Sequence, residues 1–224
     1  YLKTPMHLGC IQNNEVVVAL LLEHQAQVNV KDFLDEYPLH LAVKNKNEHI
    51  VDMLLTHKAD VNVQDKKLNT PLHYAAGHYN ATIVHKLCLK KAKINIKNKK
   101  LDTPLHRACS KNNEQLVNQL LYYKANVNLK NNELHTPLHL ACLRQNENIV
   151  AQLLNHDALV NETNDILNTP LHIACLLGHE KIIQRLLEYP VDVNLKNVAL
   201  ETPFLAACSL KNVSLVKQMI EQKD

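Results

Sequence analysis

A Thr-Pro dipeptide that returns every 33 residues restricts the fold of this chain more than any other feature. In the second repeat Tyr replaces the Thr, and an Asn returns in step with the dipeptide from Asn29 to Asn194. The dipeptides stand at Thr4-Pro5, Tyr37-Pro38, Thr70-Pro71, Thr103-Pro104, Thr136-Pro137, Thr169-Pro170 and Thr202-Pro203. Equal intervals without an insertion predict a solenoid, in which each repeat contacts only its neighbours.

The stretch from Thr136 to Asn161 shows what one repeat contains. Thr136 can cap a helix, and Pro137 suits the first helical position because its missing N–H costs nothing there. Small and apolar residues follow on one face of a short first helix, and a polar turn separates them from a second apolar stripe at helical spacing. The first set is Leu138, Ala141 and Cys142, and the second is Ile149, Val150, Leu153 and Leu154. Neither helix buries its stripe alone, so neighbouring repeats must cover it.

Four short motifs carry a resemblance to a known family. They are Thr-Pro-Leu-His, the following Ala-Ala or Ala-Cys, the second helix with Val/Ile-Val and Leu-Leu, and the closing Ala-x-Val-Asn. This pattern resembles the ankyrin repeat over essentially all 224 residues. The resemblance implies an all-α repeat solenoid, a stack of helix pairs with short β-hairpin fingers between them. We expect a single ankyrin-repeat domain over residues 1–224, with repeats 1–32, 33–65, 66–98, 99–131, 132–164, 165–197 and 198–224.

Composition and cysteine placement agree with a soluble binding domain. Apolar residues make up 46% of the chain, charged residues 21%, and there is no Trp, which is an ordinary mixture for a folded protein. The longest apolar run, Val16 to Leu22, is far shorter than the roughly 20 residues of a membrane helix. Five of the six Cys occupy one slot of the repeat, where they replace a small buried Ala. Unpaired cysteines suit a reducing compartment, so we expect a protein of the cytoplasm, or of the nucleus.

Glycine is scarce where ankyrin repeats commonly have it. The fingertip column, two residues before the Thr, reads Leu2, Asp35, Leu68, Leu101, Leu134, Leu167 and Leu200. Leucine rarely adopts positive φ, so we expect this turn to be remodelled. The leucines either pack on the neighbouring finger, the interpretation we favour, or form an exposed stripe for a partner. At the end of the sixth repeat Pro190 takes the place of the second usual Gly and excludes positive φ there.

Two groups of residues resemble a metal or catalytic site but lack the arrangement that such a site requires. His-x-x-Cys occurs at His7, His106, His139 and His172, a spacing that could serve zinc or a Cys–His pair. The pairs are spread evenly over the repeats and do not converge, and in ankyrin repeats this His ties neighbouring repeats together. Asp102, His106 and Ser110 lack a nucleophile elbow, and three Gly leave no phosphate-binding loop. We expect no catalytic residue, no metal site and no cofactor.

Charge and exposed apolar residues suggest where a partner binds. Residues 86–111 hold nine Lys or Arg against Asp102 alone, 9 − 1 = +8, within a chain whose net charge is +3. In ankyrin repeats the fingertips and the first helices line the concave binding surface, where leucines are not needed for the fold. The predicted protein-contacting residues are Lys66, Lys67, Lys99, Lys100, Arg107, Lys111, Leu143, Arg144, Ile166, Leu176, Leu177 and Leu210.

These residues predict a non-catalytic adaptor or scaffold that binds an acidic-plus-apolar segment of another protein, without membrane insertion. One alternative is a regulatory or targeting domain of a larger enzyme or channel. A nucleic-acid binder is the least favoured alternative, because the basic stretch has one Arg and no aromatic residue to stack on bases.

Overall fold

The described chain is built from short helices joined by loops. The computed structural model describes residues 3–78 and 80–209, and in these residues it contains thirteen helices. They form two compact units, which we describe separately: unit 1 is Tyr1–Ala108 with Asn118–Ala125, and unit 2 is Cys109–Val117 with Asn126–Asp224. The predicted all-α repeat architecture is confirmed.

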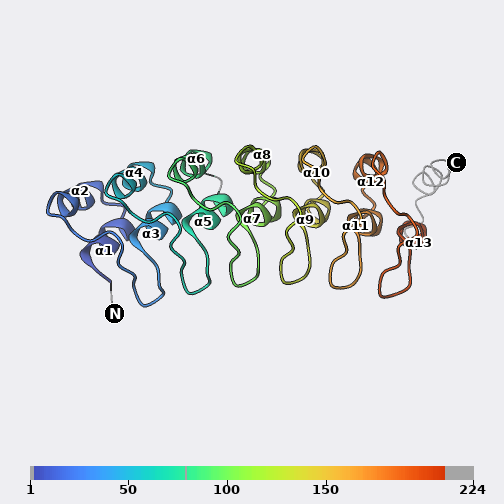
Figure 1. The fold of residues 1–224 in the computed structure, drawn as a ribbon, viewed down its shortest axis with the longest axis horizontal. Helices are drawn as coiled ribbons and strands as arrows, with labels where there is room; N and C mark the ends of the chain where they lie inside the picture. Colours follow the sequence, from blue (N-terminus) through green and yellow to red (C-terminus); the bar gives the residue numbers. More distant parts are fainter. Residues whose placement is uncertain (1–2, 79, 210–224) are drawn as a thin grey trace. The chain divides into compact units, whose positions relative to one another are not determined.

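Unit 1 contains three complete helix pairs. In Figure 1 the first helices of these pairs lie side by side in one row and the second helices in another, with the fingers on the far side of the first row. The pairs are α1 (Pro5–Ile11) with α2 (Glu15–Glu23), α3 (Pro38–Lys44) with α4 (Glu48–Thr56), and α5 (Pro71–Gly77) with α6 (Ala81–Leu89). The division between the units falls within α7 (Pro104–Ser110) and α8 (Glu114–Tyr122).

Unit 2 repeats the same arrangement. Helix α11 packs between α9 and α13, while α10 packs on α12. The helices are α9 (Pro137–Leu143), α10 (Glu147–Leu154), α11 (Pro170–Leu177), α12 (Glu180–Leu187) and α13 (Pro203–Ser209). On α9 and α11 the side chains of the motif Leu and of the small Ala and Cys that follow it are buried, for example at Leu171, Ala174 and Cys175. The core is therefore aliphatic, as the composition indicates.

Helix boundaries follow from the capping residues. At α11 the N–H of His172 donates to Thr169 Oγ1 over 3.3 Å, and the N–H of Thr169 donates to His172 Nδ1 over 3.2 Å. Most second helices begin after an Asn, as at α4, where Asn47 Oδ1 accepts the N–H of Ile50 over 2.8 Å. These bonds satisfy N–H groups that have no partner inside the helix. The repeated Asn cap escaped the sequence analysis, although its spacing of 33 residues carried the signal.

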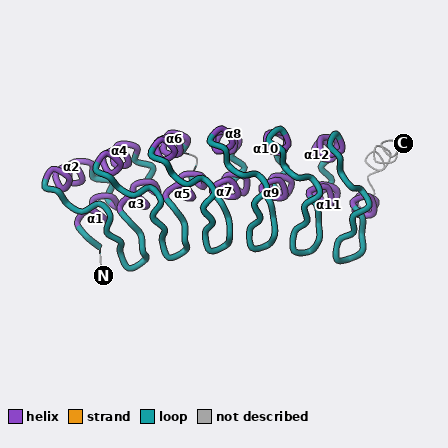
Figure 2. The backbone as a smooth tube through the Cα atoms, in the orientation of Figure 1, coloured by secondary structure: helices purple, strands orange, loops and turns teal. Residues whose placement is uncertain are grey.

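The expected fingers are hairpin loops, and residues 3–78 and 80–209 form no β-strand (Figure 2). The turn of each finger is held by an Asp or Asn at its base. In the third repeat Asp65 Oδ1 accepts the N–H groups of Lys67 and Asn69, both over 2.8 Å, and Asp65 O accepts the N–H of Leu68 over 2.8 Å. The side chain of Asp65 thus stabilises the turn, a role that hydrogen bonds between the two strands would have in a longer β-hairpin.

The prediction of a remodelled fingertip turn was wrong. Leu68, Leu101, Leu134, Leu167 and Leu200 all adopt left-handed backbone conformations, with φ between 55° and 61°. Three backbone N–H groups of the turn donate to the Asp or Asn at the finger base, and these bonds hold the conformation against the roughly 1–2 kcal/mol that a left-handed Leu costs. Four of these leucines are 41–46% exposed and Leu200 is 72% exposed, so the interpretation as a packed ladder is not supported.

The end of the sixth repeat differs from the others, as Pro190 predicts. In repeats one to five the second helix closes on a left-handed residue, and the next N–H reaches back five residues, as from Ala158 to Leu153 O over 3.1 Å. In the sixth repeat Leu186 O instead accepts from Tyr189, and Val191 donates to Tyr189 O over 2.7 Å. Pro190 does not take the left-handed conformation.

Candidate functional site

The histidine column binds neighbouring repeats together. In five of these histidines Nε2 lies 3.0–3.1 Å from a finger carbonyl of the following repeat, and the pairs are His7–Glu36, His40–Asn69, His73–Asp102, His139–Asn168 and His172–Glu201. Because Nδ1 accepts the N–H of the motif Thr or Tyr, Nε2 carries the proton and donates it to the carbonyl. Burial lowers the pKa of His73 to about 4 and that of His139 to about 3. The predicted structural role of this column is confirmed.

The cysteines next to these histidines are buried thiols. Cys10, Cys109, Cys142 and Cys175 are completely buried. Desolvation raises the pKa of Cys10 and of Cys175 to about 12, so these thiols are poor sources of the thiolate that a nucleophile or a zinc ligand needs. In the part of the chain that the structure describes, no three His, Cys, Asp or Glu side chains come together as a metal site.

In the pattern of Asp102, His106 and Ser110, the ring of the histidine is engaged with its own helix cap. His106 Nδ1 lies 3.2 Å from the N–H and 2.8 Å from the Oγ1 of Thr103. The nitrogen that a triad carboxylate would orient is therefore engaged with the helix cap. The backbone carbonyl of Asp102 accepts the Nε2–H of His73, so this residue also belongs to the ties between repeats.

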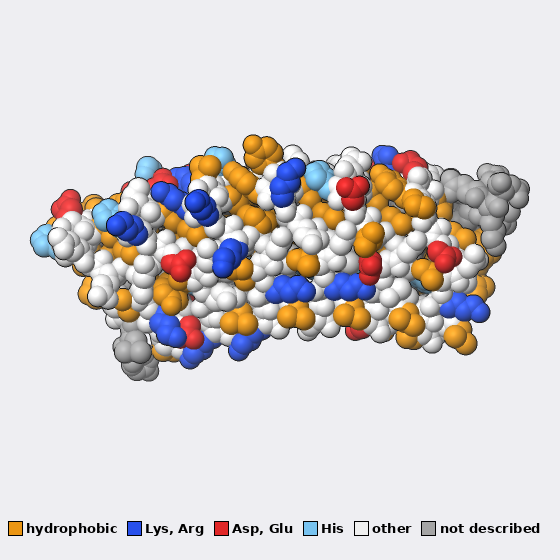
Figure 3. Space-filling model, in the orientation of Figure 1, with side chains coloured by type: hydrophobic (Ala, Val, Ile, Leu, Met, Phe, Trp, Pro, Cys, Tyr) orange, Lys and Arg blue, Asp and Glu red, His pale blue; other side chains and the backbone are white. Residues whose placement is uncertain are grey.

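In unit 1 the predicted contact residues fall into two groups. Lys66 and Lys67 lie on one fingertip, Lys99 and Lys100 lie on the next, and all four are exposed. The tips are joined by a hydrogen bond from Lys99 N to Lys67 O over 2.9 Å. Figure 3 shows Lys or Arg side chains beside apolar ones along this finger edge. The structure therefore brings the four lysines together at the fingertips, and they form the first group. Arg107 is the second group and lies on α7, one of the first helices of the repeats.

Arg107 is half-buried against helix α5. Its guanidinium nitrogens approach the position that a Cβ of Gly77 would occupy, the nearest at 3.3 Å. Burial is the main cause of the lowered pKa of His73, and the charge of Arg107 lowers it further, against the hydrogen bond to Asp102 O, which raises it. Tyr74 and His78 stack on this helix with ring centroids 6.2 Å apart. Because Gly77 has no side chain, it leaves space for the side chain of Arg107 from the next repeat. The spacing of residues in the sequence did not predict this contact.

In unit 2 the predicted contact residues are mostly apolar. Leu143 is 40% exposed at the end of α9, and Leu176 and Leu177 are 37% and 43% exposed at the end of α11, which packs on α9. Ile166 is exposed on a fingertip. Arg144 follows α9 and Lys111 follows α7, both exposed. Leu210 lies outside the described residues, so the apolar group rests on the three helical leucines and Ile166.

A polar cluster that the sequence did not predict joins α3 and α5 to the neighbouring fingers. Lys44 donates to the carboxylate of Glu36 and lies 4.2 Å from the centroid of the Tyr74 ring, while the Tyr74 hydroxyl donates to Asp65. Burial lowers the pKa of Lys44, but the hydrogen bond to Glu36 and the electrostatic interactions with Tyr74 and Glu36 together outweigh burial and raise it. The cluster links the finger that contains Glu36 to the finger that contains Asp65.

The described helices are all short, and none combines the length and hydrophobicity that crossing a bilayer requires.

Comparison with known proteins gives matches at the level of family and fold. A profile of three ankyrin repeats matches residues 39–131 and 105–197, and a second ankyrin-repeat profile matches residues 6–55. No curated protein matches the chain.

Among solved structures, the chain is similar to the ankyrin repeat domain of Bcl-3, described as a unique member of the IkappaB protein family. The identity is 26%, the TM-score is 0.83, and the alignment covers 96% of this chain and 98% of that one. The human ASB11 ankyrin repeat domain is 24% identical, with a TM-score of 0.84 and 98% of each chain covered, and this likeness shows the fold alone. With profile matches that together span residues 6–197, the chain belongs to the ankyrin-repeat family.

Proposed function

We propose that this protein is a non-catalytic adaptor or scaffold that binds another protein through its first helices and fingertips. Ankyrin-repeat domains are general protein-interaction modules, and the fold is generally non-catalytic. The observation that carries the proposal is the exposed group Leu143, Leu176 and Leu177 on the adjacent helices α9 and α11. These side chains do not belong to the fully buried core of unit 2, and exposed apolar groups of this kind are typical of binding surfaces.

Unit 1 supplies the charge for the same function. Lys66, Lys67, Lys99 and Lys100 are exposed on neighbouring tips, and Arg107 adds a fifth positive charge on the first helices. Charges on a binding surface mainly raise the association rate and select partners of opposite sign. A partner that suits both units presents an acidic portion to unit 1 and an apolar portion to unit 2.

The cysteines and the repeat period support the proposed cellular location and domain organisation. Its six cysteines are free thiols, which suits the reducing cytoplasm or nucleus. The period of 33 residues continues without an insertion through residues 109–125, where the two units divide. This continuity supports one ankyrin-repeat domain over residues 1–224.

Affinity capture followed by binding kinetics with the captured partner tests the function. Leu176→Ala with Leu177→Ala is expected to raise the dissociation rate more than tenfold, at about 1 kcal/mol or more for each anchor. Leu159→Ala is the matched control, because Leu159 is exposed in the same unit but lies outside α9 and α11. Equal dissociation rates for the double variant and the control would refute the proposed surface.

Two double variants test whether the tip lysines raise the association rate. Lys99→Glu with Lys100→Glu is expected to slow association and to weaken its dependence on salt, whereas Lys90→Glu with Lys93→Glu makes the same change of charge away from the tips. Circular dichroism checks that all variants fold. If the tip variant associates as fast as the wild type, the steering role of these lysines is wrong.

A further inference from the structure

Two successive fingertips of unit 1 carry the same three residues. They are Lys66-Lys67-Leu68 and Lys99-Lys100-Leu101, and we call them together the Lys-Lys-Leu edge. The hydrogen bond from Lys99 N to Lys67 O holds the two tips next to each other at 2.9 Å. Four ammonium groups and two leucine side chains therefore share one narrow edge of the unit. Steering of an acidic protein segment explains the lysines but leaves the leucines unexplained.

The lysines of this edge keep their charge available. All four are exposed, and among the described residues none of them forms a salt bridge. The acidic residue at the base of the first tip is occupied, since the carboxylate of Asp65 accepts from the Tyr74 hydroxyl and from two backbone N–H groups. The edge thus presents a concentrated positive charge to whatever lies beyond it.

The backbone of the edge has no N–H group left to offer. Residues 66–69 donate in turn to Leu34 O, Asp65 Oδ1, Asp65 O and Asp65 Oδ1, over 2.8–3.0 Å. Residues 99–102 donate in turn to Lys67 O, Asn98 Oδ1, Asn98 O and Asn98 Oδ1, over 2.8–3.0 Å. A peptide that adds as a β-strand finds no donor here. A surface of low polarity, in contrast, meets no N–H group that must lose its water without a partner.

The two leucines are exposed in spite of a conformational cost. Leu68 and Leu101 have φ of 57° and are 41% and 44% exposed. Glycine would adopt this conformation without strain, and the fold gains little from a side chain that stays in water. A strained backbone that the surrounding bonds maintain is a reason to look for a function of the residue.

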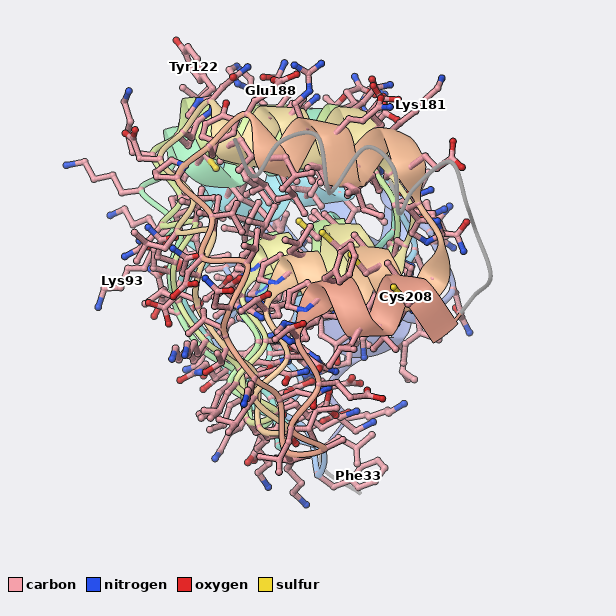
Figure 4. The ribbon with its side chains drawn as sticks, turned by 90° about the vertical axis from the view of Figure 1, so that its right-hand side faces the viewer. Phe33, Lys93, Tyr122, Lys181, Glu188 and Cys208 are labelled. Atoms are coloured by element: carbon pink, nitrogen blue, oxygen red, sulfur yellow. The ribbon has the colours of Figure 1, made fainter. Side chains whose placement is uncertain are left out.

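We propose that the Lys-Lys-Leu edge docks on an anionic membrane surface. The lysines bind the phosphate and carboxylate groups of the lipid heads, and Leu68 and Leu101 enter the boundary between headgroups and acyl chains. Figure 4 shows the fingers projecting away from the helices, with Phe33 of the preceding finger at their far end, so a flat surface has access to the tips. Each lysine near such a surface contributes about a fivefold increase in binding, which makes the four together worth several hundredfold.

This proposal goes beyond protein binding and does not depend on it: it shares the tip lysines with the proposed function, but the leucines of α9 and α11 take no part. A nucleic acid fits the edge less well, since the six residues include no aromatic side chain on which bases stack. A membrane also accounts for the alternation of charged and apolar side chains, which a phosphate backbone does not use.

Sedimentation of the full chain with lipid vesicles tests the proposal. Vesicles of phosphatidylcholine with one quarter phosphatidylserine are expected to bind the protein, vesicles of phosphatidylcholine alone are expected not to bind it, and added salt should weaken the binding. Lys66→Gln with Lys67→Gln should lower the partition coefficient about 25-fold, at about fivefold for each lysine. Lys90→Gln with Lys93→Gln should leave it unchanged, because both lysines are exposed, Lys90 is the C-cap residue of α6, and Lys93 lies away from the fingertips (Figure 4).

The leucines are tested with Leu68→Gly and Leu101→Gly, which keep the backbone conformation and remove the side chains. We expect a loss of at least fivefold in vesicle binding, and no loss for the control Leu89→Ala, an exposed leucine at the end of α6. Equal binding to both kinds of vesicle, or equal effects of tip and control variants, overturns the proposal. So does a result in which an acidic peptide or duplex RNA binds the edge and the anionic vesicles do not. A protein that loses vesicle binding while its protein partner still responds to Leu176 and Leu177 leaves the proposed function intact.

Discussion

Acidification from pH 7.5 to pH 5.0 is expected to destabilise this protein through its buried histidines. His73 in unit 1 and His139 in unit 2 are 1% and 0% exposed, and both are neutral donors to a carbonyl of the next repeat. Burial lowers the pKa of His73 from 6.5 to about 4 and that of His139 from 6.5 to about 3. In the unfolded chain both side chains return to the ordinary value near 6.5.

The sign and size of the effect follow from proton linkage. Above pH 6.5 neither state binds the proton, so the full stability is present. Below pH 6.5 the unfolded state is protonated and the folded state is not, so the free energy of unfolding falls as the pH falls toward the folded pKa. From pH 6.5 to 5.0 the loss is about 1.5 units at about 1.4 kcal/mol each, or about 2 kcal/mol for each histidine. His40 and His172, whose pKa values burial also lowers, act in the same direction.

Urea titrations followed by circular dichroism at pH 7.5, 6.5, 5.5 and 5.0 measure this loss. His139→Gln keeps an amide donor near Asn168 O and removes the titrating group, so its loss on acidification should be smaller than that of the wild type by about 2 kcal/mol. His156→Gln, at an exposed position after α10, should follow the wild type. Equal stability of the wild type at pH 7.5 and 5.0, or the same pH dependence in His139→Gln, would refute the reasoning.

Three further predictions concern the fingers and the thiols. Leu101→Gly should change the free energy of unfolding by less than about 1 kcal/mol, since the strain it relieves and the entropy it adds are of similar size, whereas Leu101→Val should lose about 1–2 kcal/mol in a thermal melt because a branched side chain resists positive φ. Asn98→Ala removes the side-chain oxygen that accepts the N–H groups of Lys100 and Asp102. It should lower the free energy of unfolding by about 2–4 kcal/mol in urea titrations, and a loss below about 0.5 kcal/mol would mean that the turn does not need the Asn98 side chain. Cys208, the only one of the six cysteines that is exposed, should react first with a thiol reagent such as DTNB, and Cys208→Ser should abolish the fast phase of the labelling.

The helix pairs and the ties between repeats could be predicted from the sequence, because each depends on short patterns that repeat. Thr169, His172 and Cys175 occupy fixed offsets on one short helix, so their capping, bonding and packing follow from that spacing. The conformation of Leu68 did not follow, because it depends on two competing terms, the strain of the leucine and the hydrogen bonds of Asp65. A rule for leucine alone gave the wrong answer.

The candidate site divides in the same way. The exposure of Leu176 and of the tip lysines could be inferred from their places in the repeat, since these places lie outside the motif that forms the buried core. The position of Arg107 over Gly77 was not predictable, because it joins side chains of two repeats at offsets outside the shared motif. The identity of the partner depends on a second molecule, so it cannot be inferred from the spacing of residues within this chain.

The ties between repeats also determine how the chain gains its structure in time. His Nε2 and the carbonyl it binds are separated by 29 residues, and Lys86 and Gln119 reach back 38 residues to the preceding repeat. Within each unit these hydrogen bonds link one repeat to the next and do not reach farther along the chain, so contact order stays low and does not grow as repeats are added. Folding can therefore start at any strong pair of repeats and spread outward, and a pulling force should remove repeats one after another from an end.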